Sequence, residues 1–379
     1  MSKITDAELE RLRSRIGSTA GARDEPYLTE VTRDSIRHWA WGTGDRNPLY
    51  LDKAYAQSAG HADVVGPPAM LYAFSRHSVG FRGGLPGVHS VFGGSHWKWH
   101  KRLTPGMQIT PASTLTALDE MPSKFAGRMF KQLGTTRFDD GNGPVAEVES
   151  WTLRFERSAA RERNPEKQSA AKNDAAAPGA ESSERASLSA EVIAQITEEY
   201  RKEAATAGRG SDWAAVEVGG EIPSLIRGPY SSTCAVAFEM AWGGAYVLSH
   251  GYWYEFLSKH PGASLRSEEG VPETAESVHW DARAAKRAGV ASSYDLGPER
   301  VAWLATLLTN WAGPRGFLSE MYCEVRGFNI AGNLMRCNGR VVEKQEEDGK
   351  GIVRVDIEAV DAKGKVTAFG WGKIEFPLD

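Results

Sequence analysis

The chain has 379 residues, a length that favours two domains over a single core. Hydrophobic residues make up 41% and charged residues 25%, which is typical of a globular protein. The formal net charge is −4 and the basic residues form no block, which argues against nucleic acid or an anionic membrane as the main partner. No run of about 18 apolar residues predicts a membrane span. The charged N-terminal stretch lacks the apolar segment of a signal peptide, so a cytoplasmic location is expected.

Residues with metal or redox chemistry form no recognisable site. The three cysteines, Cys234, Cys323 and Cys337, have no Cys-x-x-Cys spacing, which predicts reduced, buried thiols. The histidines form no His-Glu-x-x-His motif, and no Gly-x-Gly-x-x-Gly or phosphate-binding loop is present. We therefore expect neither a metal nor a redox cofactor.

Residues 158–187 form the clearest break in composition. This stretch contains no aromatic and no β-branched residue, so it cannot bury enough apolar surface to offset the entropy lost on ordering. It is predicted to be a disordered linker. The linker separates an N-terminal domain, residues 1–157, from a C-terminal domain, residues 188–379.

The two predicted domains carry similar segments in the same order. Residues 49–60 (LYLDKAYAQSAG) and 278–289 (VHWDARAAKRAG) share an aspartate and a final Ala-Gly at an offset of 229 residues. Residues 32–42 (TRDSIRHWAWG) and 233–243 (TCAVAFEMAWG) match at an offset of 201. Ordered matches of this kind indicate an internal duplication.

The change between the two offsets locates an insertion in the second copy. The difference of 28 residues places it at about Tyr246 to Glu273. The inserted segment would either cover one end of a substrate tunnel or form a surface excursion. In each copy a Gly-Pro pair, Gly66-Pro67 or Gly297-Pro298, precedes an apolar segment that predicts a long buried helix. Alternating strands follow, separated by turn signals, so each copy is predicted to be an α+β unit.

The motif with chemical meaning lies in the first copy. Residues 39–60 read WAWGTGDRNPLYLDKAYAQSAG, and HADVVGPPAMLYAF follows. This resembles the signature of the MaoC-like (R)-specific enoyl-thioester hydratases and their dehydratase relatives. The matching positions are Gly44, Asp45, Asn47, Pro48, Leu49, Asp52, Ala56, Gly60, Pro67 and Pro68. The resemblance implies a double hot-dog fold, in which each unit has a long helix wrapped by an antiparallel sheet.

The resemblance also implies an activity: the reversible conversion of a trans-2-enoyl thioester to a 3-hydroxyacyl thioester. Asp45 would be the base, and the backbone near Gly66 and Pro67 would polarise the thioester carbonyl at a helix start. Asn47, Gly66 and Pro67 are the candidate substrate-binding residues. The carrier would be coenzyme A or acyl carrier protein, and the chain could form a homodimer or join a partner hydratase subunit.

Both copies depart from the family's aspartate–histidine pair. Tyr50 replaces the histidine in the first copy, and a phenol, which titrates near 10, donates a proton more readily than it accepts one. In the second copy His279 occupies the histidine position. The residue that corresponds to Asp45 is Tyr246 at the offset of 201 and Thr274 at the offset of 229. Sequence alone leaves three possibilities open.

In the first possibility Asp45 and Tyr50 form the site, with Tyr50 as the acid or as a water-positioning group. In the second, His279 works with another group, such as His250 or Asp281. In the third, the chain is a non-catalytic acyl-binding subunit or needs a partner. A hot-dog thioesterase, whose aspartate would activate water against the carbonyl, is the alternative from another reaction class.

Overall fold

A computed structural model describes most of the chain. The described residues are 4–19, 26–81, 83–85, 88–122, 128–155, 188–244 and 246–378. The predicted linker, residues 158–187, lies outside them. Within these ranges no helix combines the length and the apolar character needed to cross a membrane.

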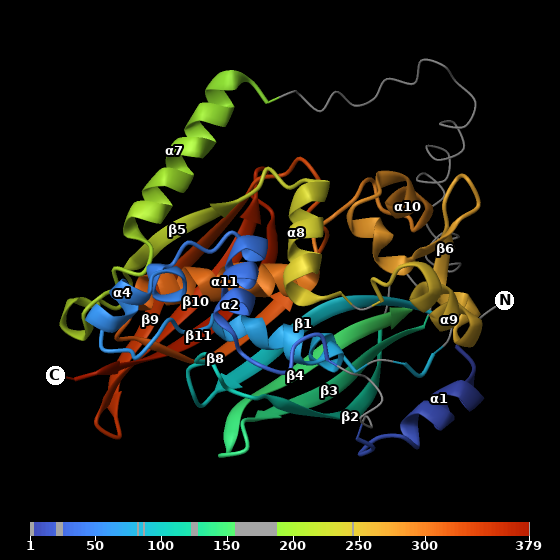
Figure 1. Cartoon of the computed structure of the whole chain (residues 1–379), viewed down its shortest axis with the longest axis horizontal. Coiled ribbons are helices and arrows are strands. Elements are labelled where there is room, and N and C mark those ends of the chain that lie inside the picture. Colours follow the sequence, from blue (N-terminus) through green and yellow to red (C-terminus); the bar gives the residue numbers. More distant parts are fainter. Residues whose placement is uncertain are drawn as a thin grey trace.

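A nine-stranded antiparallel sheet forms the centre of the molecule (Figure 1). Its order is β2-β3-β4-β1-β8-β11-β10-β9-β5. The first copy contributes β1 (His89–Trp99), β2 (Thr110–Met121), β3 (Met129–Asp139) and β4 (Pro144–Phe155). The second contributes β5 (Glu221–Arg227), β8 (Phe317–Val325), β9 (Met335–Glu347), β10 (Lys350–Asp361) and β11 (Val366–Pro377).

The two copies meet where β1 pairs with β8. The paired residues run from Gly94 opposite Glu324 to Lys98 opposite Glu320. Reading outward from this join gives β1, β4, β3, β2 on one side and β8, β11, β10, β9 on the other. The same antiparallel order therefore occurs twice, as the duplication predicts.

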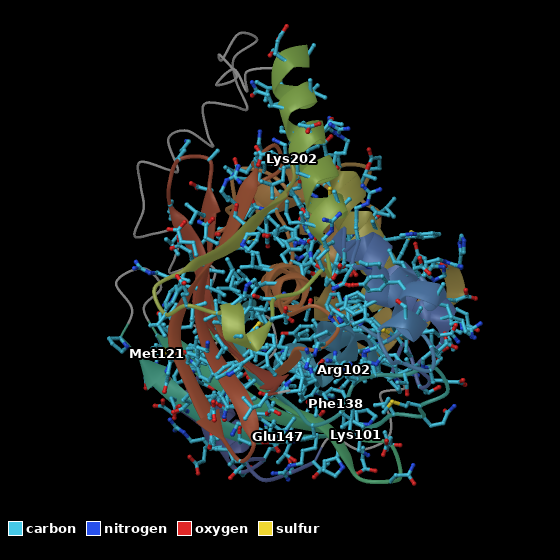
Figure 2. The ribbon with its side chains drawn as sticks, turned by 90° about the vertical axis from the view of Figure 1, so that its left-hand side faces the viewer. Lys101, Arg102, Met121, Phe138, Glu147 and Lys202 are labelled. Atoms are coloured by element: carbon cyan, nitrogen blue, oxygen red, sulfur yellow. The ribbon has the colours of Figure 1, made fainter. Side chains whose placement is uncertain are left out.

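Helices cover the sheet and connect its strands. The first copy has α1 (Asp6–Arg13), α2 (Arg33–Thr43), α3 (Pro48–Leu51), α4 (Lys53–Ser58) and the 3-10 segments η1 (Pro68–Phe74) and η2 (Arg76–Val79). The second has the helical segments α7 (Ala190–Thr206), η3 (Trp213–Ala215), α8 (Ser232–Trp242), α9 (His250–Lys259), η4 (Pro261–Ala263), η5 (Ala275–His279), α10 (Ala282–Arg287) and α11 (Gly297–Ala312). It also has the short strands β6 (Ser264–Arg266) and β7 (Pro272–Thr274). Figure 2 shows α7, marked by Lys202, projecting from the body of the molecule.

Helices α2 and α8 correct the register of the duplication. Each has 11 residues and begins after a capping hydroxyl, that of Thr32 or Ser231. Each ends at a glycine in the left-handed conformation, Gly44 or Gly243. Both ends are offset by 199 residues (231 − 32 and 243 − 44), whereas the sequence match suggested 201. At this offset, which applies before the insertion, Gly244 is the residue that corresponds to Asp45.

The prediction of a long buried helix is correct for the second copy and wrong for the first. Helix α11 has 16 residues and is buried for most of its length against both parts of the sheet. In the first copy the seven-residue η1 and the four-residue η2 form instead, with Ser75 in an extended conformation between them. Outside donors occupy carbonyls that a longer α-helix would use: Trp242 Nε1 donates to Tyr72 O, and Leu28 N donates to Ala73 O.

Candidate functional site

The first motif loop, residues 44–52, holds Asp45 away from solvent. Asp45 Oδ1 accepts the Asn47 N–H at 3.0 Å, and Oδ2 accepts the Thr306 hydroxyl of α11 at 2.8 Å. The side chain is only 3% exposed and lines neither of the two cavities described below. The carboxylate therefore joins the loop to the middle of α11.

A buried charge also acts on Asp45. Arg227 lies in the same interior region, donates from Nε to Thr43 O at 3.1 Å and pairs with Glu203 at 3.0 Å. Burial raises the pKa of Asp45 above its usual range, while its hydrogen bonds to Asn47 and Thr306 and the charge of Arg227 act in the opposite direction. All of these contacts suit a carboxylate that stabilises the interior.

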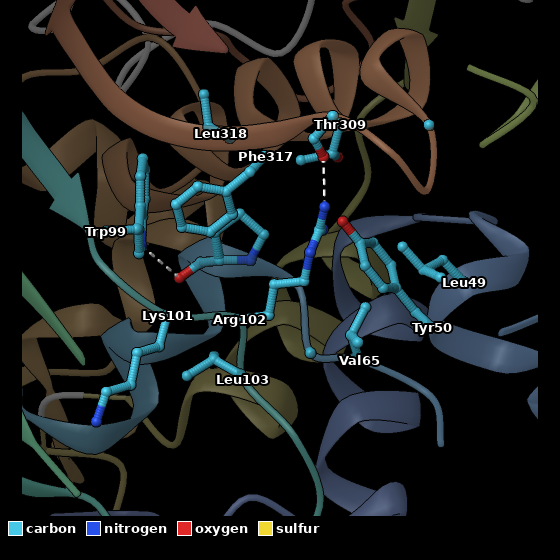
Figure 3. Close-up of a pocket in the computed structure, with 14 residues that line it drawn as sticks. Leu49, Tyr50, Val65, Trp99, Lys101, Arg102, Leu103, Thr309, Phe317 and Leu318 are labelled. Carbon is cyan, nitrogen blue, oxygen red and sulfur yellow. Dashed lines mark hydrogen bonds between the residues drawn. The ribbon is translucent and has the colours of Figure 1, made fainter. Parts of the chain in front are cut away.

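Tyr50 faces a small cavity of about 30 Å³. In Figure 3 its phenol lies beside the guanidinium of Arg102, below Thr309 of α11. Arg102 donates to the carbonyls of Pro314 and Gly316, which closes this side of the cavity. Burial raises the pKa of Tyr50 above its usual value, so the phenol stays protonated at neutral pH.

The other candidates in the first copy are engaged in local structure. Asn47 is fully buried, and its Oδ1 accepts the Leu49 N–H at 3.0 Å, which caps α3. The Gly66 N–H donates to Leu103 O at 2.8 Å. Pro67 and Pro68 have no N–H to offer. Gly66 and Pro67 therefore supply no backbone donor for a thioester carbonyl in this conformation.

The second motif loop, residues 274–281, repeats the local structure of the first. Thr274 Oγ1 accepts the Glu276 N–H, just as Asp45 Oδ1 accepts the Asn47 N–H. Of the two positions that sequence offered for the answer to Asp45, the loop hydrogen bond thus supports Thr274. At the same offset Glu276 corresponds to Asn47, and His279 corresponds to Tyr50.

His279 is held as a neutral imidazole. Its Nδ1 lies 2.9 Å from Tyr294 O, and because a carbonyl can only accept, Nδ1 carries the proton. Burial lowers the pKa of His279 to about 4. At neutral pH the ring therefore presents an unprotonated Nε2, the form that a general base requires.

His279 lines a cavity of about 790 Å³. Both copies contribute to its wall, from η2, β1 and β4 in the first and from α9, η4, η5 and α11 in the second. Apolar side chains make up much of the lining, including Phe81, Leu85, Val91, Phe92, Phe256, Leu265, Val278 and Leu296. The inserted segment lies over this cavity through Phe256 to Leu265. A volume of this size is in the range of small-molecule sites.

The start of α11 opens into the same cavity. Leu296, Gly297 and Pro298 line it. Pro298 has no N–H and the Glu299 N–H donates to Leu296 O at 3.1 Å, so Gly297 is the residue that brings an N–H to this helix start. A side chain at Gly297 would meet Phe92 Cδ1 at 2.5 Å, so only glycine fits without displacing the ring. Gly297 therefore packs against Phe92 at the wall of the cavity, at the start of α11.

The two residues considered as partners of His279 lie elsewhere. His250 is exposed at the start of α9, and Asp281 caps α10 by accepting the Arg283 N–H. Neither lines the large cavity. Sequence reasoning missed Gly297 as a donor, although its match to Gly66 was visible. It also missed Glu276, which lines the cavity, because the family pattern has an amide at that position.

Known proteins resemble this chain in part of its sequence and in its fold. A family model described as "FAS1-like, dehydratase domain region" matches residues 18–147. A UPF0336 protein of Streptomyces coelicolor is 30% identical over 139 residues, covering 35% of this chain and 87% of that protein. A probable enoyl-CoA hydratase alpha subunit of Thermomonospora curvata is 28% identical over 164 residues, covering 38% of this chain but only half of that subunit.

Solved structures match over nearly the whole chain. A MaoC-like dehydratase is similar with a TM-score of 0.64 at 20% identity, covering 97% of this chain and all of that one. A Mycobacterium tuberculosis protein described as having a double hot-dog fold matches with a TM-score of 0.54 at 10% identity, covering 95% and 96% of the two chains. The predicted α+β double hot-dog fold is therefore confirmed.

Proposed function

Because this chain belongs to the MaoC-like hot-dog dehydratase family, we propose that it is an acyl-thioester hydratase/dehydratase whose site is the cavity of about 790 Å³. The reaction would interconvert a trans-2-enoyl thioester and a 3-hydroxyacyl thioester, with coenzyme A or acyl carrier protein as the carrier. One observation carries the proposal: His279, whose pKa is lowered by burial, and Gly297, the first residue of α11, line the same cavity. The enoyl-CoA hydratase name of the Thermomonospora relative supports the reaction class.

In the hydration direction, His279 Nε2 would accept a proton from water as the water oxygen bonds to C3. The C2=C3 electrons move toward the thioester oxygen, which becomes an enolate. The Gly297 N–H would stabilise that oxygen, and a preorganised donor of this kind contributes up to roughly 10²–10³ in rate. Proton delivery to C2 then completes the net addition of one water molecule.

The first motif loop would serve the structure instead. Asp45 already accepts two hydrogen bonds, and the Gly66 N–H already donates to Leu103 O. The cavity beside Tyr50, at about 30 Å³, holds about one water molecule, not an acyl chain. These contacts favour His279 over the pair Asp45 and Tyr50.

Stereochemistry, direction and assembly are further parts of the proposal. The motif resemblance supports the R configuration at C3 and a reaction that runs in both directions. The alpha-subunit name of the Thermomonospora relative supports association with a partner hydratase subunit, and a homodimer is the alternative assembly.

The test is a panel of enoyl-CoA thioesters, from crotonyl-CoA to long and bulky acyl groups. We expect the enoyl absorbance to fall without release of free thiol, and chiral chromatography to show a 3R product. Free thiol would indicate a thioesterase. Binding without turnover, with or without an added hydratase subunit, would indicate an acyl-binding protein.

Two variants locate the reaction. His279→Gln should lower turnover by about 10²–10⁴-fold, the range for a general base. Tyr50→Phe removes only a hydroxyl beside the small cavity and should stay within about 3-fold of wild type. The reverse pattern would move the reaction to the first motif loop.

A further inference from the structure

Two carboxylates converge beside the second motif loop. Glu239 belongs to α8 and is 7% exposed, and Glu276 belongs to η5. A Cβ atom built on Gly244 would lie 2.5 Å from Glu239 Oε2 and 3.1 Å from Glu276 Oε2. Both carboxylate oxygens therefore occupy the space that a side chain at residue 244 would need.

Gly244 follows the end of helix α8 at the place where Asp45 follows the end of helix α2 in the first copy. In the first copy a left-handed glycine, Gly44, ends the helix, and Asp45 follows it. In the second copy Gly243 ends the helix in the same conformation, and Gly244 follows it. The second copy thus lacks an aspartate after the helix, and two glutamates from neighbouring elements bring carboxylates to this place.

Glu276 is the member of the pair that reaches the cavity. It lies three residues before His279 in the 3-10 helix η5, and side chains three residues apart in such a helix project on the same side. Both residues line the cavity of about 790 Å³, whereas Glu239 does not. Glu239 is buried on α8, and its carboxylate approaches Gly244 together with that of Glu276.

We propose that Glu276 is the second acid–base catalytic residue of the His279 site and that Glu239 is its positioning residue. This inference rests on the proposed hydratase function. It replaces the aspartate–histidine pair implied by the sequence resemblance with a pair in which the carboxylate comes from the position of Asn47. Gly244 leaves the space in which the two carboxylates meet.

The proton balance is complete with these two groups. His279 takes a proton from water while the oxygen bonds to C3, and the C2=C3 electron pair shifts to form the enolate. The protonated Glu276 carboxyl donates its proton to C2, and the enolate electrons form the new C2–H bond. The proton on His279 then returns to Glu276, directly or through water, which restores both groups. Dehydration follows the same steps in reverse.

The test compares Glu276→Gln, Glu276→Asp and Glu239→Gln with wild type on the best substrate of the thioester panel. Glu276→Gln should lower kcat by about 10²–10³-fold with little change in KM, because the amide cannot transfer the proton. Glu276→Asp should recover part of this loss. Glu239→Gln should lower kcat by about 10-fold or less. Glu255→Gln, on the exposed face of α9, is the matched control and should have no effect.

Hydrogen exchange separates catalysis from structural support. In D₂O the wild-type protein should exchange the C2 hydrogen of a 3-hydroxyacyl thioester, and Glu276→Gln should lose this exchange while it still binds the substrate. If Glu276→Gln keeps kcat and exchange within about 3-fold of wild type while His279→Gln is inactive, this inference is wrong and the proposed function stands. If wild type hydrates no enoyl thioester, the proposed function itself fails.

Discussion

The two motif loops share a turn hydrogen bond and differ in their contact with helix α11. The first loop directly follows α2, whereas the inserted segment separates the second loop from α8. The first loop reaches the middle of α11, where Asp45 bonds to Thr306 and lines neither of the two cavities. The second faces the start of the same helix, where Gly297 and His279 line a large cavity. In the first copy the motif side chains thus serve packing, and we propose that the chemistry lies in the copy with the weaker sequence match.

The largest effect that tests this comparison is on stability. Asp45→Ala removes the acceptor for the Thr306 hydroxyl and the Asn47 N–H, and it leaves a small void. Two buried donors without acceptors should lower the free energy of unfolding by about 2–4 kcal/mol. Thr274→Ala, at the corresponding place in the second loop, should lose about 1 kcal/mol. Urea unfolding measures both.

The same variant also tests the assignment of function. Folded Asp45→Ala protein should keep its turnover within a few-fold of wild type. A stable Asp45→Ala protein whose turnover falls by about 10²-fold or more would instead make Asp45 the base and reverse the roles of the two loops.

A second effect depends on pH and on His279. The pKa of His279 is lowered by burial to about 4, from 6.5 in the unfolded chain, so the unfolded state binds more protons between these values. This contribution to stability is fully present above pH 6.5 and is lost as the pH falls toward 4, by up to about 3 kcal/mol. Urea unfolding at pH 7.5, 5.5 and 4.5 should show the decrease in wild type and a smaller one in His279→Gln. Equal slopes in the two proteins would mean that His279 is not held neutral.

The smallest effects distinguish the two helix starts. A Cβ at Gly66 would lie 2.9 Å from Leu103 Cβ, so Gly66→Ala should cost about 1 kcal/mol of stability, measured by urea unfolding, without changing kinetics. A Cβ at Gly297 would displace Phe92 at the wall of the large cavity. Gly297→Ala should therefore raise KM or lower kcat by about 10-fold. Kinetic loss in Gly66→Ala with none in Gly297→Ala would contradict the assignment of the oxyanion site.

The proposed site could be predicted only in part. His279 was recognisable because the second copy repeats the spacing of the first around Asp281, and Gly297 could have been found from its match to Gly66. Glu276 could not, because its relation to Glu239 depends on how α8 and η5 pack beside Gly244. The closure of the space beside Tyr50 was equally hidden, since Arg102 and the carbonyls of Pro314 and Gly316 come from distant segments.

The sequence by itself determined the α+β class, the duplication and the family resemblance, because periodicity, turn residues and repeated motifs are local properties. Only the tertiary structure decided which copy has the long helix, since the carbonyls of Tyr72 and Ala73 bond to Trp242 and Leu28 instead of to the next turn. The tertiary structure also decided where the cavities lie. Cavities arise from packing among segments far apart in the chain, and no local pattern records whether a motif side chain faces solvent, a ligand or another helix.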